Sequence, residues 1–273
     1  MIGTPPRAHV LSAGTPGGPC AVFAHGIEDS WRTWTRLARC LGPRWRSIAL
    51  DLPWRAGNDY RWRWSGTPAD WVGAGLDALD DLSFVLVGHS FGGNAALVRL
   101  AAGEPRATAA VLVAPFFRPA EAAVTWRTFE RSREAFERQI GDGMRLRLRS
   151  ATPPDVFEVM LTRTCERIGP VGFLTVFEQY LASGHLALSQ VDVPALILAG
   201  AADPGMLRPH LEVLASRLPR GAIACGADFD HFCHIRKAPE VAQAIEDVAA
   251  EADPYPGRTG RFSTSGGPRK NGA

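Results

Sequence analysis

The feature that most constrains the fold of this chain is a regular alternation of apolar runs with segments of helical periodicity. Short runs rich in β-branched and other apolar residues, typical of buried strands, occupy residues 20–26, 45–53, 84–88 and 108–115. Segments that repeat apolar residues at helical spacing lie between them, at residues 30–41, 68–81 and 94–103. Buried strands that alternate with helices are typical of a mostly parallel central sheet flanked by helices, so we expect an α/β fold.

The alternation stops after Pro115 and resumes near residue 193. Between these points the periodicity predicts helices without strands, at residues 121–140, 153–168 and 170–184. A strand, a helix, a weak strand and a final helix then follow, at residues 193–204, 207–219, 222–226 and 239–252. The simplest account is a helical cap inserted between two strands of one sheet.

This organisation divides the chain into four parts. We predict the first part of the core at residues 1–117, the helical cap at 118–187 and the second part of the core at 188–252. Residues 253–273 are rich in Gly, Pro, Ser and Arg and contain little that a core could bury. We therefore expect this tail to be disordered.

Composition excludes several classes of protein. The chain has 273 residues, of which 46% are apolar, and a net charge of +2, which is too small to indicate a nucleic-acid partner. No segment has the apolar length of a signal peptide or a membrane span, so we expect a cytoplasmic protein without membrane association. The five cysteines form no C-x-x-C pair, which argues against disulfides and against a zinc site. We expect no metal and no organic cofactor.

A serine stands where the strand at 84–88 passes into the helix at 94–103. The intervening residues read Gly-His-Ser-Phe-Gly, with Ser90 at the centre. Glycines on both sides permit a tight turn that exposes the hydroxyl above the sheet, and the helix directs its first N–H groups towards developing negative charge. A strand, this turn and a helix are the setting that a nucleophilic serine requires.

A nucleophilic serine needs a histidine base and an acid that orients it. Asp203 ends the strand at 193–204, at the carboxyl edge of a parallel sheet, and His231 follows the strand at 222–226. The chain order Ser90, Asp203, His231 is the order found in one particular fold. Asp228 and Asp230 are alternative acids, but they lie beside the histidine in sequence.

At these residues the sequence resembles the α/β-hydrolase family. The similar segments are VLVGHSFGG, FAHGIEDSWRTW, LAGAADP and DHFCHIRKAPEV, which lie in the order found in that family. The resemblance covers most of residues 20–250 apart from the cap and implies the α/β-hydrolase fold with a helical cap. It also implies that the backbone amides of Ile27 and Phe91 form the oxyanion hole, and that His25 braces the loop that carries Ile27.

The resemblance leaves the identity of the base open. DHFCH aligns with the Gly-His-Phe segment of the family, which favours His231, although Asp230 stands in place of the glycine. His231 lies eight residues before Pro239, where relatives often have seven, so His234 remains a competitor. Cys233 could act as a nucleophile only if the better-placed Ser90 did not.

Substrate-binding residues are harder to predict, because the segment DLPWRAGNDYRWRW departs from the family pattern. Seven of the eight tryptophans lie between Trp31 and Trp71. They either line an apolar, partly cationic pocket or simply fill space between core and cap. We select Glu28, Trp31, Trp54 and Trp126 as candidates for contact with the substrate.

These features predict a serine hydrolase that cleaves a small-molecule carboxylic ester or thioester through an acyl-enzyme. The serine itself excludes the related sub-families that use an aspartate nucleophile, which include the epoxide hydrolases. The runner-up is an acyltransferase, a cyclase or an editing thioesterase of natural-product biosynthesis, for which a carrier-protein-bound substrate would suit the basic, Trp-rich segment. A third alternative is a hydrolase fold that binds a ligand without catalysis.

Overall fold

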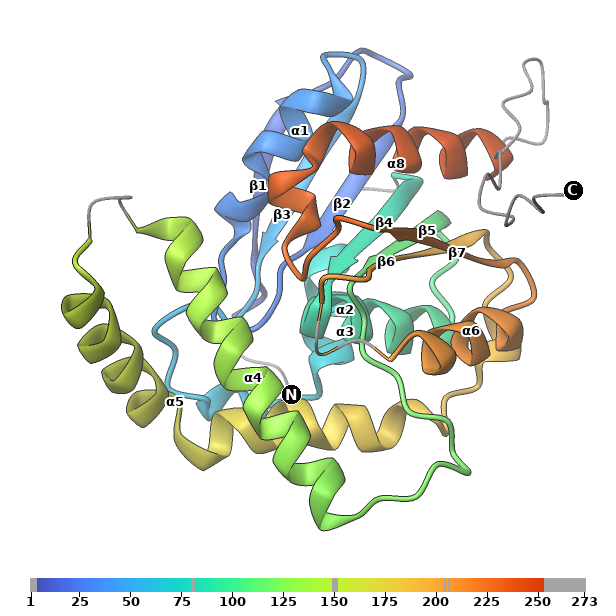
Figure 1. The fold of residues 1–273 in the computed structure, drawn as a ribbon. Helices are drawn as coiled ribbons and strands as arrows, with labels where there is room; N and C mark the ends of the chain where they lie inside the picture. The colour runs from blue at the N-terminus through green and yellow to red at the C-terminus, as the bar shows by residue number, and fades with distance from the viewer. Residues whose placement is uncertain (1–3, 80–81, 149–151, 204, 206, 253–273) are drawn as a thin grey trace, which may run out of the picture.

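The computed structural model of the protein describes residues 4–79, 82–148, 152–203, 205 and 207–252. Its centre is a seven-stranded sheet in the order β1-β3-β2-β4-β5-β6-β7 (Figure 1). The strands are β1 (Arg7–Ala13), β2 (Cys20–Ala24), β3 (Arg46–Asp51), β4 (Phe84–His89), β5 (Ala107–Val113), β6 (Ala195–Gly200) and β7 (Gly221–Gly226). The sheet is parallel except for β1, which pairs antiparallel with β3.

The sequence pattern does not predict β1. This strand lies at the edge of the sheet and its residues are exposed or only half-buried. An edge strand needs no continuous apolar run, so it lacks the signal that marks the interior strands. By contrast, β4 is the central strand and all six of its residues are buried. Its register with β2 pairs Val22 with Leu86 and Phe23 with Val87. This register fixes the position of Ser90 relative to the carboxyl end of β2.

Helices cover both faces of the sheet (Figure 1). On one face lie α1 (Thr35–Leu41) and α8 (Ala238–Ala252), and on the other lie α2 (Pro68–Asp77), α3 (Ser90–Ala101) and α6 (Arg208–Arg217). Short elements complete this core, namely the 3-10 helices η1 (Trp31–Trp34), η2 (Arg61–Trp64) and η3 (Leu188–Gln190) and the helix α7 (Cys233–Arg236). Alternate residues of β2 pack into the two separate apolar layers, with Val22 in one and Phe23 in the other.

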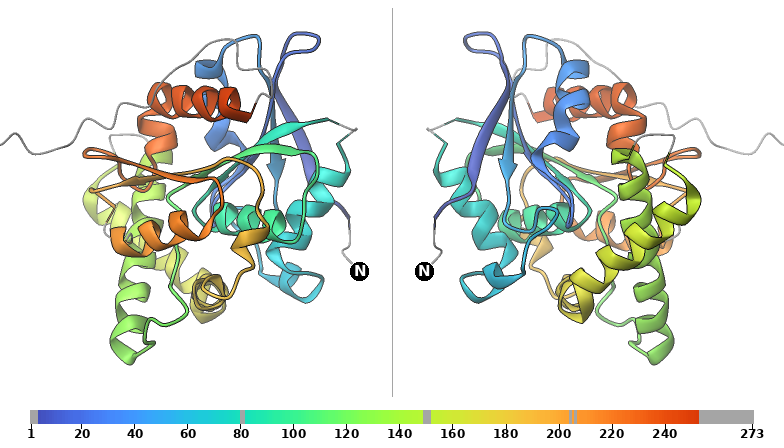
Figure 2. Two further views of the ribbon diagram at one scale, coloured as in Figure 1. Left: turned by 90° about the vertical axis from the view of Figure 1, so that its right-hand side faces the viewer. Right: turned by 90° about the vertical axis from the view of Figure 1, so that its left-hand side faces the viewer.

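Two long helices occupy the region predicted to contain helices only. They are α4 (Trp126–Arg147) and α5 (Pro154–Ser183), and their buried aromatic side chains join the apolar layer beneath α2 and α3. In both views of Figure 2, α4 begins at the end of the molecule far from α8 and runs towards the segment that precedes α8. The helix α5 is interrupted at Gly169, whose φ of 58° is left-handed, and Pro170 follows. The helices predicted at 153–168 and 170–184 meet at this break.

The fold confirms the predicted α/β class. The division into core and cap at residues 118 and 188 stays a prediction, and the predicted disordered tail, 253–273, lies outside the described residues. Within the described ranges, no helix combines the length and apolar character needed to cross a membrane.

Candidate active site

Ser90 lies in a strained turn between β4 and α3. Its φ is +50°, a left-handed conformation that a non-glycine residue rarely adopts, and its side chain is buried. The glycines around it are required by close packing. A Cβ at Gly88 would lie 2.5 Å from the Cα of Gly93, and one at Gly92 would lie 2.3 Å from the carbonyl oxygen of His25. The sequence therefore places the serine hydroxyl on a turn that its neighbours hold rigidly.

His231 and Asp203 meet in the structure. His231 follows β7, Asp203 follows β6, and Nδ1 of the imidazole lies 2.6 Å from Oδ2 of the carboxylate. The backbone N–H of Gly205 donates to the other carboxylate oxygen at 2.9 Å. Burial raises the pKa of Asp203, but His231 and these hydrogen bonds outweigh it and lower the pKa overall. The acid is therefore ionised and holds Nδ1, which leaves Nε2 of His231 for proton transfer.

His234, the competing base, makes different contacts. Its Nε2 lies 3.0 Å from Oγ1 of Thr33, and burial lowers the pKa of this imidazole to about 3. The alternative acids are also engaged elsewhere, Asp228 with Lys237 and Asp230 with Arg236. The geometry therefore brings His231 to Asp203 and keeps His234 apart from it.

Cys233 offers no competing nucleophile. Its side chain is only 1% exposed, and burial raises the pKa of its thiol to about 12. A thiol in this state is not ionised near neutral pH, and the thiolate is the reactive form of cysteine.

A residue from α4, Gln139, also contacts the His231–Asp203 pair. Its Nε2 lies 3.2 Å from Nδ1 of His231, and its hydrogen bond to Asp203 helps to lower the pKa of that acid. Gln139 is not among the site residues predicted from the sequence. The residue lies on a charged amphipathic helix, far along the chain from both partners, so no local motif marks it.

The loop after β2 carries the predicted oxyanion amide of Ile27. His25 braces this loop, because its Nδ1 lies 2.8 Å from the carbonyl oxygen of Gly26 and its Nε2 lies 3.1 Å from the N–H of Leu52. The amide of Leu52 can only donate, so Nε2 accepts and Nδ1 carries the proton. Burial lowers the pKa of His25, which keeps it in this neutral form. The other predicted amide, that of Phe91, lies in the first turn of α3, where no helical carbonyl can accept from it.

Two acids follow Ile27, and both contact arginines of the long helices. Glu28 has a left-handed φ of 55°, is buried, and accepts hydrogen bonds from Tyr60, Asn58 and Arg167 of α5. Oδ1 of Asp29 lies 3.2 Å from Nη1 of Arg147, at the end of α4. The loop that carries Ile27 is thus fastened to both α4 and α5. The Glu28 carboxylate is therefore engaged by protein groups, and the contact of Glu28 with a substrate stays a prediction.

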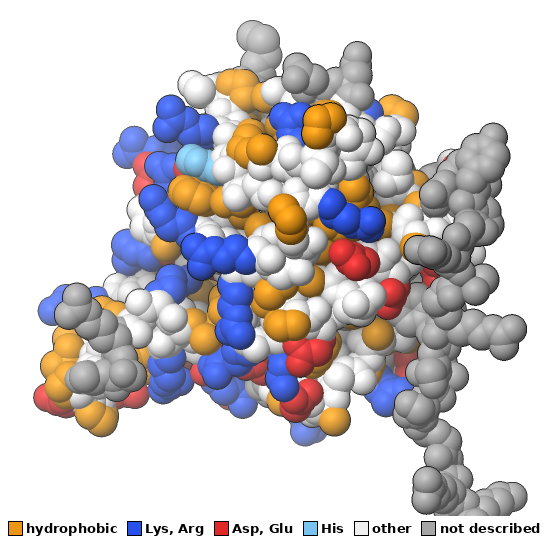
Figure 3. Space-filling model, turned by 90° about the horizontal axis from the view of Figure 1, so that it is seen from above, with side chains coloured by type: hydrophobic (Ala, Val, Ile, Leu, Met, Phe, Trp, Pro, Cys, Tyr) orange, Lys and Arg blue, Asp and Glu red, His pale blue; other side chains and the backbone are white. Residues whose placement is uncertain are grey.

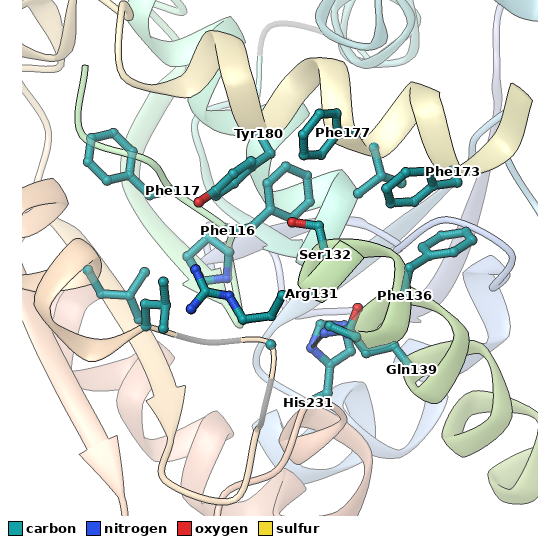
Figure 4. Close-up of a pocket in the computed structure, with 16 residues that line it drawn as sticks. Phe116, Phe117, Arg131, Ser132, Phe136, Gln139, Phe173, Phe177, Tyr180 and His231 are labelled. Atoms are coloured by element: carbon teal, nitrogen blue, oxygen red, sulfur yellow. Dashed lines mark hydrogen bonds between the residues drawn. The ribbon is translucent and has the colours of Figure 1, made fainter. Parts of the chain in front are cut away.

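An aromatic pocket opens beside His231 (Figure 4). It encloses about 800 Å³ including its open mouth. Its apolar wall is formed by the rings of Phe116, Phe117, Phe136, Phe173, Phe177 and Tyr180. Figure 4 shows Gln139 next to His231 at one end of the pocket and Arg131 in its middle. Ser90 is not among the residues that line this space, so the pocket borders the candidate site at His231 and Gln139 and not at the serine itself.

The structure does not place the selected tryptophans at this pocket. Trp54 is fully buried between Trp62 and Phe91, whereas Trp126 is 81% exposed at the start of α4. Trp31 stacks on His9 at a centroid distance of 4.0 Å. The pocket wall is built from phenylalanines of α4, α5 and the segment after β5. The tryptophan cluster mainly fills space in the core.

The basic, Trp-rich segment is largely neutralised. Arg55 pairs with Asp51, Arg61 with Asp59, and Arg63 with Glu178 of α5. Figure 3 shows Lys and Arg side chains spread over one face of the molecule and interspersed with hydrophobic and acidic ones. Each of these three arginines of the segment therefore has an acidic partner.

The fold and the serine-bearing turn define the class of this protein, an α/β enzyme with its polar side chains gathered where β2, β4, β6 and β7 end. The chain belongs to the alpha/beta hydrolase family, whose model matches residues 21–244.

Individual relatives agree with this class. The chain is 32% identical over 91 residues to Epoxide hydrolase 4 of Mus musculus, which covers 32% of this chain and 25% of that protein. It is 36% identical over 107 residues to Lipase LipV of Mycobacterium tuberculosis, which covers 38% of this chain and 40% of that protein. These matches span well under half the length of each relative. The crystal structure of a membrane phospholipase A superposes with a TM-score of 0.67 at 19% identity, over 90% of this chain and 86% of that one, and shows a shared fold.

Proposed function

We propose that this enzyme is a serine hydrolase that cleaves a carboxylic ester or thioester through an acyl-enzyme on Ser90. The observation that carries the proposal is the combination of a strained serine at the end of β4 with the 2.6 Å contact between His231 and Asp203 at the ends of β7 and β6. The carboxyl ends of parallel strands meet at one edge of a sheet, where catalytic groups gather.

The reaction follows from these roles. His231 accepts the proton of the Ser90 hydroxyl as Oγ attacks the acyl carbon, and the amides of Ile27 and Phe91 donate to the oxyanion. His231 then gives that proton to the departing alcohol or thiol, which leaves the acyl group on Ser90. A water molecule, deprotonated by His231, then attacks the acyl carbon, and His231 returns that proton to Oγ of Ser90 as the bond to the serine breaks and the acid leaves. Asp203 holds the imidazole and stabilises its protonated form, and Gln139 holds the pair.

The aromatic pocket suggests which kind of acyl group the enzyme accepts. Its phenylalanine walls favour a hydrocarbon chain or an aromatic acid, because such groups lose water-exposed apolar surface when they enter. Arg131 offers a cation in the same space, and within the described residues it has no acidic partner. We infer that an acyl group with a polar or anionic substituent at a distance from the carbonyl fits better than a plain alkyl chain.

The test is to compare the wild type with Ser90→Ala on a panel of p-nitrophenyl esters and acyl thioesters of varied length. We expect the substitution to lower kcat/KM by at least about a thousandfold, because the nucleophile is lost. A fluorophosphonate probe should label the wild type and leave Ser90→Ala unlabelled. Ser216→Ala, at an exposed serine of α6, is the matched control and should behave as the wild type. Equal rates in the wild type and Ser90→Ala would contradict the proposed mechanism.

The same acyl-enzyme can pass its acyl group to an alcohol or amine instead of water. Incubation of the acyl-enzyme with candidate acceptors, including acyl carrier proteins, separates the two reactions. We expect free acid as the product. An acceptor ester or amide formed faster than the acid would assign the protein to acyl transfer.

A further inference from the structure

Three buried side chains next to the proposed active site bring potential metal ligands together. They are Asp29, His89 and His234, and one ligand atom of each lies within 4.8 Å of those of the other two. Asp29 is 5% exposed, His89 1% and His234 0%. They come from three separate segments, namely the loop after β2, the end of β4 and the helix α7. Tertiary structure alone assembles this cluster.

Each of the three side chains has a polar atom with no hydrogen-bond partner among the described residues. These atoms are Oδ2 of Asp29, Nδ1 of His89 and Nδ1 of His234. Buried polar atoms are nearly always paired, because an unpaired one loses its hydration without replacement. Three such atoms in one cluster of a carboxylate and two imidazoles indicate a missing common partner.

The remaining polar atoms of the cluster are held by neighbours. Nε2 of His89 lies 2.8 Å from the carbonyl oxygen of His231, so it must carry the proton, and Nδ1 keeps its lone pair. Nε2 of His234 lies 3.0 Å from Oγ1 of Thr33. Oδ1 of Asp29 accepts from the N–H of Ser30 at 2.9 Å and from Arg147 at 3.2 Å. Outer contacts of this kind orient the ligands of metal sites.

Glycine keeps the space beside one of these ligands open. A Cβ at Gly26 would lie 2.9 Å from Nδ1 of His89 and 3.3 Å from its Cε1. Any other residue at this position would press on the free nitrogen.

We propose that Asp29, His89 and His234 bind one divalent first-row transition-metal ion of the zinc type. Two imidazole nitrogens and one carboxylate oxygen are a ligand set that suits such ions, and they leave one tetrahedral position for water. The ion would connect the segment before Ser90, the helix after His231 and the loop that carries Ile27. Its role is therefore to fix these three segments relative to one another. The alternative is that a water molecule occupies the centre of the cluster. In that case the protein would bind no metal ion there.

The first measurement uses full-length protein freed of metal with a chelator that is then removed. Titration with Zn²⁺ by calorimetry should show one equivalent bound, and the melting temperature should rise with the free Zn²⁺ concentration. Co²⁺ should replace Zn²⁺ and give visible absorption bands typical of nitrogen and oxygen ligands in a site of low coordination number. Ser90→Ala should bind both ions as the wild type does, so this result is independent of the proposed hydrolysis.

Variants identify the ligands. His234→Gln and Asp29→Asn should each weaken Zn²⁺ binding by at least about a hundredfold, and Thr33→Val, which removes only the outer partner of His234, by roughly tenfold. His185→Gln is the matched control, because His185 is exposed on the chain after α5 and lies outside the cluster. It should bind Zn²⁺ with unchanged affinity.

The wild-type titrations decide the proposal even if a ligand variant does not fold. Absence of stoichiometric Zn²⁺ and Co²⁺ binding to the wild type would overturn it in favour of a buried water. Binding that is lost in His185→Gln, or that persists with the same cobalt spectrum in His234→Gln and Asp29→Asn, would also overturn it.

Discussion

At the scale of single residues, the proposed site depends on positions where the backbone leaves its ordinary conformations. Ser90 and Glu28 both have left-handed φ values, of 50° and 55°, although neither is glycine. Such conformations cost about 1–3 kcal/mol each and persist only where the surroundings enforce them. At Ser90 the enforcing contacts come from Gly88 and Gly92, which allow the turn to pack directly against neighbouring backbone.

Gln139 provides a prediction at this scale. As a positioning residue for His231 and Asp203, it should affect turnover more than substrate binding. We expect Gln139→Ala to lower kcat by roughly tenfold, the value of one hydrogen bond of about 1.4 kcal/mol to the ionised Asp203. The melting temperature should stay close to that of the wild type.

Steady-state kinetics on an activated ester would check this prediction. Gln243→Ala serves as the control, because Gln243 is exposed on α8 and, among the described residues, its side chain forms a hydrogen bond only with Asp247 of the same helix. An unchanged kcat in Gln139→Ala, or a change confined to KM, would contradict a positioning role.

At the scale of elements, α4 and α5 are fastened to the loop after β2 by two ion pairs. Arg167 of α5 reaches the buried Glu28, and Arg147 of α4 reaches Asp29. The pairing raises the pKa of Arg167, chiefly through its hydrogen bond to Glu28. These contacts tie the helices that bear the aromatic pocket to the loop that carries the predicted oxyanion amide.

Removal of the Arg167 side chain should destabilise the fold, because it leaves the Glu28 carboxylate buried and without its counter-ion. We expect Arg167→Met to lower the free energy of unfolding by about 2 kcal/mol, which is less than for a fully buried pair since the Arg167 side chain is 38% exposed. Chemical denaturation measures this change.

The same helix offers a matched control. Arg163 pairs with Glu166 at the surface, where both side chains are largely exposed. Arg163→Met should therefore change the free energy of unfolding by less than about 0.5 kcal/mol. If the two variants lost equal stability, the contact between Arg167 and Glu28 would contribute no more to the free energy of unfolding than a surface ion pair does.

At the scale of the whole molecule, one buried acid links several elements around the sheet. The side chain of Glu104 is fully buried and accepts hydrogen bonds from Arg99 of α3 and from Arg106, which also reaches the end of α2. Burial raises the pKa of Glu104, but the two arginines outweigh this effect and lower it below its ordinary value of 4.5. The folded state therefore favours the ionised carboxylate.

This shift predicts an acid-dependent part of the stability. The contribution of Glu104 is fully present above the unfolded pKa near 4.5 and is lost as the pH falls through the lower folded pKa. Glu104→Gln should lower stability at neutral pH and flatten its decline below about pH 4.5. Glu121→Gln, at an exposed acid, is the control. Denaturation curves at several pH values give the comparison, and parallel declines in the wild type and Glu104→Gln would contradict it.

Much of the molecule could be predicted from sequence because its signals are local. The interior strands are continuous apolar runs, the helices between them are periodic, and the turn at Ser90 is marked by adjacent glycines. The edge strand β1 could not be predicted in this way, since an edge strand buries too little to need an apolar run. The tryptophans selected as substrate contacts do not line the pocket beside His231, and their contact with the substrate stays a prediction. An aromatic residue signals burial, but not which cavity it faces.

The sequence by itself determined the α/β class, the strained serine turn and the chain order of the candidate site, because each depends on residues close together in the chain. Only the tertiary structure decided which histidine meets Asp203, since His231 and His234 lie three positions apart on one short segment and differ only in the neighbours they face. It also decided the phenylalanine pocket, the contact of Gln139 and the cluster of Asp29, His89 and His234. These depend on distances between remote segments, which packing sets and no local pattern encodes.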